Sequence, residues 1–195
     1  MSALARSARR PPIVRDVATP PSPENERQAF EALIAGYADR LYSVALRITG
    51  SPEDAEDAVQ DAVLSAFQHW ARFRGQALGS TWLYRITVNA ALQRVRRRHP
   101  ADYLTETDFQ RGWVADWTED LARLTEQAEL YAVLERGITL LSEDLRVTLV
   151  LRDVEGLSSA ESAAILELTE AAVKSRLHRA RVLLRKYISD YLENR

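Results

Sequence analysis

Several residue types that support other chemistries are scarce or missing in this chain of 195 residues. There is no cysteine, which excludes disulfides and thiolate metal sites and fits a protein of the reducing cytoplasm. The three histidines, His69, His99 and His178, do not form a metal-binding spacing, so we expect neither a metal nor a cofactor. No apolar run approaches the ~20 residues that are needed to span a bilayer.

Glycine and proline are also rare, with seven of each. Leu, Ala, Arg and Glu dominate instead, and because these residues favour helices we expect an all-α protein. Residues 1–23 contain four arginines and two Pro-Pro pairs but lack the apolar stretch of a signal peptide. This segment is predicted to be a disordered basic tail.

Apolar residues recur at helical spacing in two blocks. The first block predicts three helices: one that begins near Phe30 and is stopped by Thr49-Gly50, a second with Ser51 as N-cap and Pro52 at its first position, and a third at 82–98. The stripes expected to face inward on the second and third helices are Ala55, Val59, Ala62, Val63, Ala66, Phe67 and Trp70, followed by Leu83, Ile86 and Ala90. These helices can share one core, which predicts an N-terminal helical domain at 24–100.

The second block begins after a flexible acidic linker, which we expect at 101–127, and predicts a C-terminal domain at 128–195. Gly156 is the expected C-cap of its early helices, and Ser158 and Glu161 fit a capping box. A three-residue turn, 167–169, then precedes a last helix with Thr169 as its N-cap. Two helices joined by such a turn predict a helix-turn-helix, with the buried stripe Val173, Leu177, Ala180 and Leu184.

Positive charge is concentrated in two helical segments, although the net charge is only −2. Residues 72–101 and 171–189 each contain several Lys or Arg residues and no acid. Two separate basic faces suit a protein that grips nucleic acid at two places. The alternative is that they are ordinary solvated helix faces.

Carboxylates form the opposite pattern on the second helix. Asp54, Asp57 and Asp61 fall on one stripe, with Gln60 beside them, and no Lys or Arg occurs between Arg47 and Arg72. Favourable interaction with the helix dipole accounts for an acid in the first turn, but not for the acids deeper in the helix. Because an acidic face would repel DNA, a basic protein partner is the better explanation.

Aromatic residues stand beside cationic and polar residues at the start of the third helix. Trp82, Arg85 and Asn89 share one stripe, and Tyr84 lies near them. Aromatic rings beside arginines can hold unstacked bases, each stack contributing roughly 1–3 kcal/mol. The alternative, that Trp82 and Tyr84 are core residues, remains open from the sequence.

In their order, three motifs resemble a known family. These are Asp-Ala-Glu-Asp-Ala-Val-Gln-Asp at 54–61, Phe-Arg-Gly at 73–75 with Ser-Thr-Trp-Leu-Tyr-Arg-Ile-Thr-Val-Asn at 80–89, and Val-Lys-Ser-Arg-Leu-His-Arg-Ala-Arg at 173–181. The chain resembles bacterial sigma factors of the sigma-70 family, in the extracytoplasmic-function group, over about 25–98 and 128–190.

The resemblance implies a transcription initiation factor, not an enzyme, whose partners are core RNA polymerase, promoter DNA and an anti-sigma factor. Contact with the clamp helices of the largest polymerase subunit is implied for Asp54, Asp57, Gln60 and Asp61. Contact with a −10-type element and its melted strand is implied for Arg74, Gly75, Gln76, Ser80, Trp82, Tyr84, Arg85, Asn89, Arg94, Arg96 and Arg97. Contact with a −35-type element is implied for Ser158, Thr169, Ala171, Lys174, Ser175, Arg176, His178, Arg179 and Arg181.

Three positions depart from the family pattern. Ser142 stands where proline is common, Ser162 where a branched apolar residue is usual, and Glu167 where glycine makes the turn. Residues 76–79 vary among members, so the base preference of this loop cannot be transferred. Two alternative functions remain at this point: a stand-alone helix-turn-helix regulator and, without support from any catalytic motif, a hydrolase that uses the acidic cluster.

Overall fold

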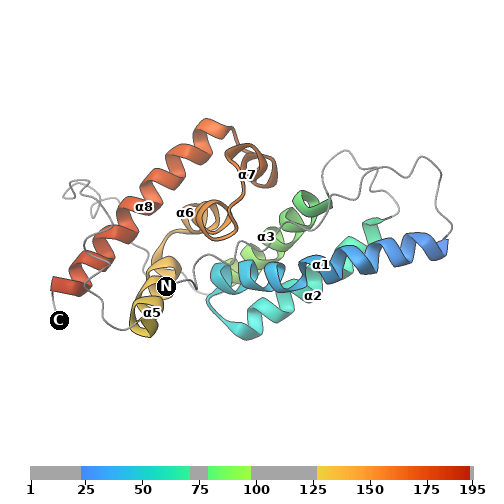
Figure 1. Ribbon diagram of the computed structural model, residues 1–195, viewed down its shortest axis with the longest axis horizontal. Coiled ribbons are helices and arrows are strands. Elements are labelled where there is room, and N and C mark those ends of the chain that lie inside the picture. Colours follow the sequence, from blue (N-terminus) through green and yellow to red (C-terminus); the bar gives the residue numbers. More distant parts are fainter. Residues whose placement is uncertain (1–22, 71–78, 98–126, 194–195) are drawn as a thin grey trace.

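The computed structural model describes residues 23–70, 79–97 and 127–193, and the regular structure in these ranges is helical. In chain order the elements are α1 (Pro23–Thr49), α2 (Pro52–His69), α3 (Gly79–Arg97), α5 (Gln127–Leu140), α6 (Glu143–Leu149), the π-helix η3 (Val150–Val154), α7 (Ser159–Leu166) and α8 (Glu170–Glu193). Helices α1–α3 form an up-down-up bundle, the N-terminal bundle, and α5–α8 form the C-terminal domain beside it (Figure 1). The all-α prediction is confirmed, whereas the predicted tail and nearly all of the predicted linker lie outside the described residues.

The ends of α1 and α2 follow from local sequence signals. Gly50 adopts a positive φ of 69°, which ends α1, and its N–H donates to the carbonyl of Leu46 at 2.7 Å. Ser51 then caps α2, since its Oγ accepts a hydrogen bond from the backbone N–H of Asp54 at 3.4 Å, with Pro52 at the first helical position. The predicted stop and N-cap are both confirmed.

The core of the N-terminal bundle differs from the predicted stripes at two places. Alanines at 55, 58, 62 and 66 line the buried face of α2, while Phe67 is 60% exposed, so the prediction that Phe67 faces inward was wrong. On α3 the buried face carries Tyr84, Thr87 and Val88 with Leu83, whereas Ile86 and Ala90 are only half-buried. Phe67 follows the buried Ala66 directly and so lies off the buried face of α2, where its ring contacts the ring of Phe30 edge-on, with centroids 5.5 Å apart.

In the C-terminal domain, α5 and α8 cross closely. A Cβ atom at Gly137 would lie 2.5 Å from Leu184 Cδ1 and 2.8 Å from Tyr187 Cδ1, so only glycine fits at this crossing. The predicted buried stripe of α8 is confirmed, because Val173, Leu177, Ala180 and Leu184 are all buried. The π-helix that follows α6 was not predicted, because its five-residue hydrogen-bond step leaves no signature in apolar spacing.

The two units share one hydrophobic cluster that continues from the N-terminal bundle into the C-terminal domain. A buried arginine, Arg146, joins them at the ends of two helices. Its guanidinium donates to the carbonyl oxygens of Ile48 at the end of α1 (2.6 Å), of Leu141 (3.0 Å) and of Thr139. Carbonyls at helix C-termini carry partial negative charge, which stabilises the buried cation.

The helix-turn-helix forms as predicted, with α7 and α8 joined by 167–169. Ser158 and Glu161 make the predicted capping box, and Thr169 Oγ1 accepts from the N–H of Ala172 at 3.2 Å. Glu167, where the family pattern has glycine, adopts the left-handed conformation with φ 56° and ψ 42°. A residue with a Cβ pays roughly 1–2 kcal/mol in this region, so the turn carries local strain.

The other two departures from the family pattern also have clear positions. Ser142 stands at the N-cap of α6, but its side chain makes no capping hydrogen bond. Ser162 is completely buried in α7, and within the described ranges its hydroxyl finds no hydrogen-bond partner. A hydroxyl that loses water without gaining a partner costs about 1–3 kcal/mol.

We therefore predict that Ser162→Ala stabilises the protein by about 1–2 kcal/mol, because it removes the unpaired hydroxyl and leaves only a small cavity. Urea unfolding followed by circular dichroism measures this difference. Ser175→Ala on the exposed face of α8 is the matched control, since it brings the same gain in helix propensity of roughly 0.5 kcal/mol. Equal stabilisation by both substitutions would show that the buried hydroxyl carries no penalty.

Candidate nucleic-acid interface

The acidic stripe on α2 is exposed but paired within the N-terminal bundle. Arg94 of α3 donates from Nη1 to Asp57 Oδ2 and from Nη2 to Asp61 Oδ2, both at 2.6 Å. The carboxylates remain 53% and 55% exposed, with Gln60 exposed beside them and Asp54 half-buried in the first turn. The sequence showed no base near these acids, because their partner lies more than 30 residues away along the chain.

One face of α3 carries the polar stripe expected from the sequence. Trp82 and Arg85 are half-buried, and Asn89 and Arg96 are exposed at the helical spacing that follows them. Trp82 packs its ring 6.1 Å from that of Trp70, which steadies it at the edge of the core. Ser80 is half-buried at the start of this helix, and Arg97 is exposed near its end.

Other residues predicted to contact the −10-type element lie elsewhere. Tyr84 is only 1% exposed, so in this structure it is a core residue, and Arg94 faces α2. Arg74, Gly75 and Gln76 fall outside the described residues. The described part of the predicted site is therefore the stripe from Ser80 to Arg97, without Tyr84 and Arg94.

The start of α8 carries the side chains that are predicted to contact the −35-type element. Lys174, Ser175, His178 and Arg179 are exposed on successive turns. Two other arginines of this surface are held by acids of the same domain: Arg176 pairs with Asp144 at 2.8 Å, and Arg181 makes two hydrogen bonds to Asp153 at 2.8 and 2.7 Å. The hydrogen bonds with Asp153 raise the pKa of Arg181, so its guanidinium stays charged.

Around the turn of the helix-turn-helix, the structure leaves Ser158, Thr169 and Ala171 exposed.

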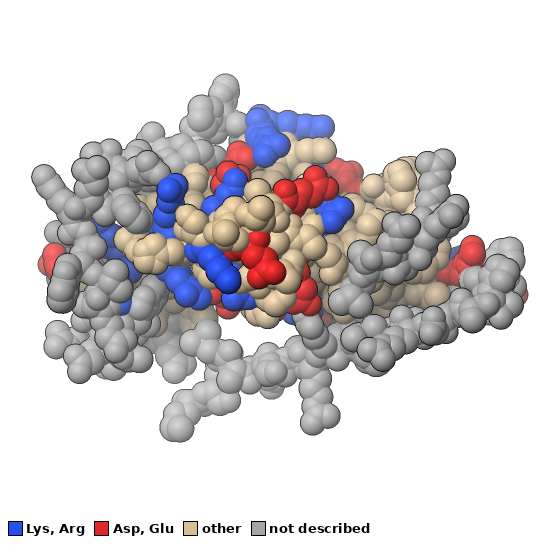
Figure 2. Space-filling view, turned by 90° about the horizontal axis from the view of Figure 1, so that it is seen from above, with Lys and Arg blue, Asp and Glu red and all other residues tan. Residues whose placement is uncertain are grey.

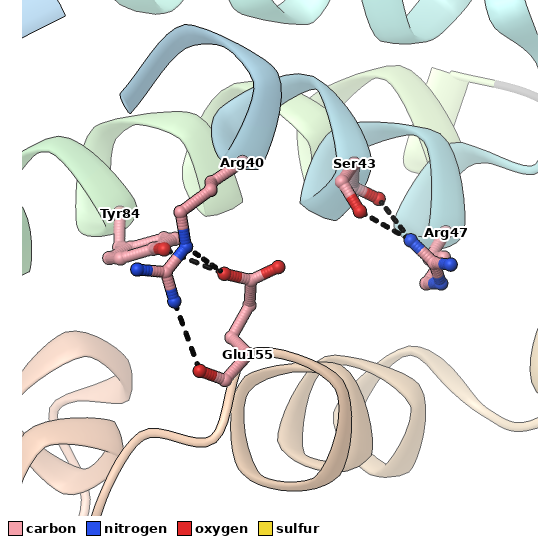
Figure 3. A network of polar contacts seen from close by, with 5 residues as sticks. All are labelled: Arg40, Ser43, Arg47, Tyr84 and Glu155. Carbon is pink, nitrogen blue, oxygen red and sulfur yellow. Dashed lines mark hydrogen bonds and ion pairs between the residues drawn. The ribbon is translucent and has the colours of Figure 1, made fainter. Parts of the chain in front are cut away.

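A polar cluster at the boundary of the two units was not predicted (Figure 3). Glu155, which follows η3, accepts hydrogen bonds from Arg40 Nε at 2.9 Å and from the Tyr84 hydroxyl at 2.7 Å, and its side chain is only 6% exposed. Burial, and then the Glu155 carboxylate, raise the pKa of Tyr84 far above its ordinary value, so its hydroxyl stays protonated and donates. Sequence offers no signal for this cluster, because Arg40 and Glu155 are 115 residues apart.

Charge is mixed on the molecular face seen from above the view of Figure 1. Basic and acidic side chains alternate over the middle of this face instead of forming one continuous basic surface (Figure 2). Ion pairs such as Arg96–Glu143 and Arg181–Asp153 agree with this mixed distribution of charge.

The described residues contain neither a metal-binding cluster nor a helix that could cross a membrane. Over 23–70, 79–97 and 127–193, no group of three or more His, Asp or Glu side chains is placed to hold a metal ion. Within the same ranges, every helix is too short or too polar to cross a membrane.

Both units match models of one protein family. Sigma-70 region 2 matches residues 33–100, and Sigma-70 region 4 matches residues 131–184. The first match contains the acidic stripe and the stripe on α3, and the second contains the helix-turn-helix. Together the matched ranges cover more than half of the chain.

Curated relatives and solved structures agree with these matches. The chain is 35% identical to the ECF RNA polymerase sigma-E factor of Escherichia coli (strain K12), over 81% of this chain and 85% of the relative. It is also 35% identical to the ECF RNA polymerase sigma factor SigM of Mycobacterium tuberculosis (strain ATCC 25618 / H37Rv), over 84% of this chain and 79% of the relative.

Two solved structures have the same fold. CnrH in complex with the cytosolic domain of CnrY matches with a TM-score of 0.63 and 26% identity, covering 84% of this chain and 90% of CnrH. The sigma factor RpoE from Bartonella quintana, in complex with the anti-sigma factor NepR, matches in fold with a TM-score of 0.59 and 21% identity over 85% and 98% of the two chains. Two sigma regions in sequence, on a fold shared with sigma factors, decide between the alternatives: the chain belongs to the sigma-70 family and is an extracytoplasmic-function sigma factor, a non-enzymatic protein that directs RNA polymerase to promoters.

Proposed function

We propose that the two helical units divide this task. The N-terminal bundle binds core polymerase through the α2 stripe, Asp54, Asp57, Gln60 and Asp61, and engages the −10-type element through α3. The C-terminal domain binds the −35-type element through the start of α8. The observation that carries this proposal is the placement of one acidic stripe and two basic stripes on three different helices. A factor with this arrangement works in the cytoplasm, where polymerase and DNA are found.

The geometry of the acidic stripe supports its role as a protein contact. Arg94 holds Asp57 and Asp61 in fixed orientations, and about half of each carboxylate surface stays open to solvent. A carboxylate has about four acceptor positions, so each can accept further hydrogen bonds from a basic partner. Preorganised carboxylates lose less side-chain entropy when that partner binds.

We expect Asp57→Asn/Asp61→Asn to weaken binding to core polymerase by about tenfold or more, because two charge-assisted contacts become neutral. Asparagine keeps the shape of each side chain and can still accept a hydrogen bond from Arg94, so the fold should be retained. Fluorescence anisotropy of labelled protein titrated with core polymerase measures the loss.

The matched control is Glu170→Gln/Glu193→Gln, which removes two exposed carboxylates from α8 and changes the net charge equally. We expect this variant to bind polymerase as the wild type does. A similar loss in both double variants would mean that overall charge, and not the α2 stripe, governs the affinity.

The length of the segment that connects the two units is compatible with a promoter of two separate elements. Elements that are one to two turns of DNA apart are separated by about 35–70 Å. The segment 98–126 between the described units has 29 residues and can extend to roughly 100 Å at about 3.3–3.6 Å per residue. Chain length therefore does not limit the spacing, and the polymerase surface must set it.

We expect Lys174→Ala/Arg179→Ala to reduce promoter-directed transcription about tenfold or more while polymerase binding is unchanged. These exposed side chains are placed to contact bases or phosphates, and each good contact contributes about 1–3 kcal/mol. Run-off transcription of the source genome with reconstituted holoenzyme, followed by RNA sequencing, identifies the promoters and measures the loss. Arg136→Ala, which removes an exposed cation from α5, should leave the transcripts unchanged. Unaltered transcripts from the α8 variant would contradict the assignment of α8.

We also propose that an anti-sigma factor controls this protein. The support is that two of the solved structures that match this chain are complexes, one with the cytosolic domain of CnrY and one with the anti-sigma factor NepR. In this proposal the partner competes with polymerase by covering the α2 stripe, and it is tethered to the membrane.

A further inference from the structure

Arg94 of α3 bridges two carboxylates of the acidic stripe on α2. Its terminal nitrogens Nη1 and Nη2 donate one hydrogen bond each, to Asp57 Oδ2 and to Asp61 Oδ2, both at 2.6 Å. Side chains four residues apart on a helix are about 5–6 Å apart at Cβ, a gap that the planar fork of one guanidinium can span. Arg94 therefore fixes the two carboxylates relative to each other as well as to α3.

The bridge leaves the solvent-facing part of each carboxylate open. The Arg94 side chain is only 23% exposed, whereas the side chains of Asp57 and Asp61 are 53% and 55% exposed. Both hydrogen bonds go to Oδ2, and within the part of the chain that the structure describes neither Oδ1 accepts one. A basic partner can therefore reach each Oδ1 while Arg94 stays in place.

The charge of Arg94 and its position act in opposite directions on a basic partner. One guanidinium against two carboxylates leaves a net charge of −1 in this cluster, and removal of Arg94 would make it −2. Long-range attraction alone would then favour a basic partner more strongly. However, two carboxylates one helical turn apart repel each other, and without a shared counter-ion their side chains lose their fixed orientation.

We propose that Arg94 is a positioning residue of the polymerase-binding site, which holds Asp57 and Asp61 as one preformed pair of acceptors and takes no part in contacting DNA. This inference rests on the proposed function, because it takes the α2 stripe as the contact with core polymerase. Side chains that are ordered before binding lose less entropy in the complex. A phosphate could engage the same two nitrogens of Arg94 only after both hydrogen bonds to the stripe were broken.

Replacement of Arg94 by glutamine tests the sign of its effect. Arg94→Gln removes the positive charge and cannot bridge both carboxylates, so we expect binding to core polymerase to weaken about fivefold, mainly through faster dissociation. Stopped-flow fluorescence anisotropy of the labelled full chain with core polymerase measures the Kd and both rate constants. Unchanged or tighter binding would overturn the proposal, because charge would then be the only effect of Arg94.

Replacement of Arg94 by lysine separates geometry from charge. Arg94→Lys keeps the net charge, but an ammonium group lacks the rigid fork that holds two carboxylates at once. We expect a loss of affinity close to that of Arg94→Gln. Wild-type affinity of the lysine variant would overturn the bridging role.

The matched control is Arg27→Gln, which removes another arginine of the N-terminal bundle that pairs with a carboxylate, Glu31, at 2.9 Å. We expect this variant to bind core polymerase as the wild type does. A loss equal to that of Arg94→Gln would show that removal of any paired arginine weakens binding, which would also overturn the proposal.

A double-mutant cycle tests whether Arg94 acts through the two aspartates. In an Asp57→Ala/Asp61→Ala background Arg94 has no carboxylate to hold, so Arg94→Gln should cause no further loss of affinity. The same loss in both backgrounds would place the effect outside the carboxylate pair and contradict the proposal. Urea unfolding followed by circular dichroism establishes that each variant is folded under the binding conditions.

Transcription at saturating polymerase tests whether Arg94 contacts DNA. If Arg94 acts only through polymerase binding, excess core polymerase should restore promoter transcripts of Arg94→Gln to the wild-type level. A loss that excess polymerase does not repair would place Arg94 at the promoter and overturn its exclusion from the DNA surface.

Failure of this inference differs from failure of the proposed function. Wild-type affinity of Asp57→Asn/Asp61→Asn for core polymerase would refute the α2 stripe as the contact, and with it the proposed function. A loss in that variant without a loss in Arg94→Gln would leave the stripe in place and overturn only the role of Arg94.

Discussion

The buried carboxylate of Glu155 is the polar contact that orients the C-terminal domain against both α1 and α3. It accepts hydrogen bonds from Arg40 of α1 and Tyr84 of α3, and Arg40 also donates to the Glu155 carbonyl oxygen at 3.1 Å. Only three residues separate Glu155 from the start of α7, so fixing this carboxylate places the helix-turn-helix against α3. The preceding π-helix ends directly before Glu155, and short π-helical segments often occur at functional sites.

Local features of this fold could be predicted from sequence because each depends on neighbouring residues. The caps at Ser51, Ser158 and Thr169 and the stop at Gly50 are contacts within four residues, and all are present. The buried stripe of α8 follows equally well from helical spacing. Most residues of the predicted acidic stripe and of the start of α8 are also exposed, because helical spacing separates them from the buried apolar stripe of the same helix.

Contacts between distant segments could not be predicted in the same way. Arg94 pairs with α2 although it lies within a basic run that suggested DNA binding, and Tyr84 enters the core although it stands in an aromatic-basic segment. Both choices depend on what lies opposite the helix, which a single sequence does not specify. Glu167 shows the same limit, since local preference favours glycine in a left-handed turn while a contact with Arg85 across the domain boundary accounts for the glutamate.

The shared hydrophobic cluster and the buried Arg146 contacts, rather than the ion pairs, contribute most of the stability of the boundary between the two units. A buried ion pair contributes little net stability, because the cost of desolvation offsets much of the attraction, and exposed pairs contribute only about 0–1 kcal/mol each.

The last turns of α3 connect the acidic stripe of α2 with the boundary between the two units. Arg94 holds the polymerase-binding acids of α2, while Arg96, two residues later, pairs with Glu143 of the C-terminal domain. A basic partner that binds Asp57 and Asp61 alters the charge balance beside Arg96, so the two contacts are coupled through one short stretch of helix. This coupling is weak, because the Asp57 and Asp61 side chains are about half exposed and solvent therefore screens their charges.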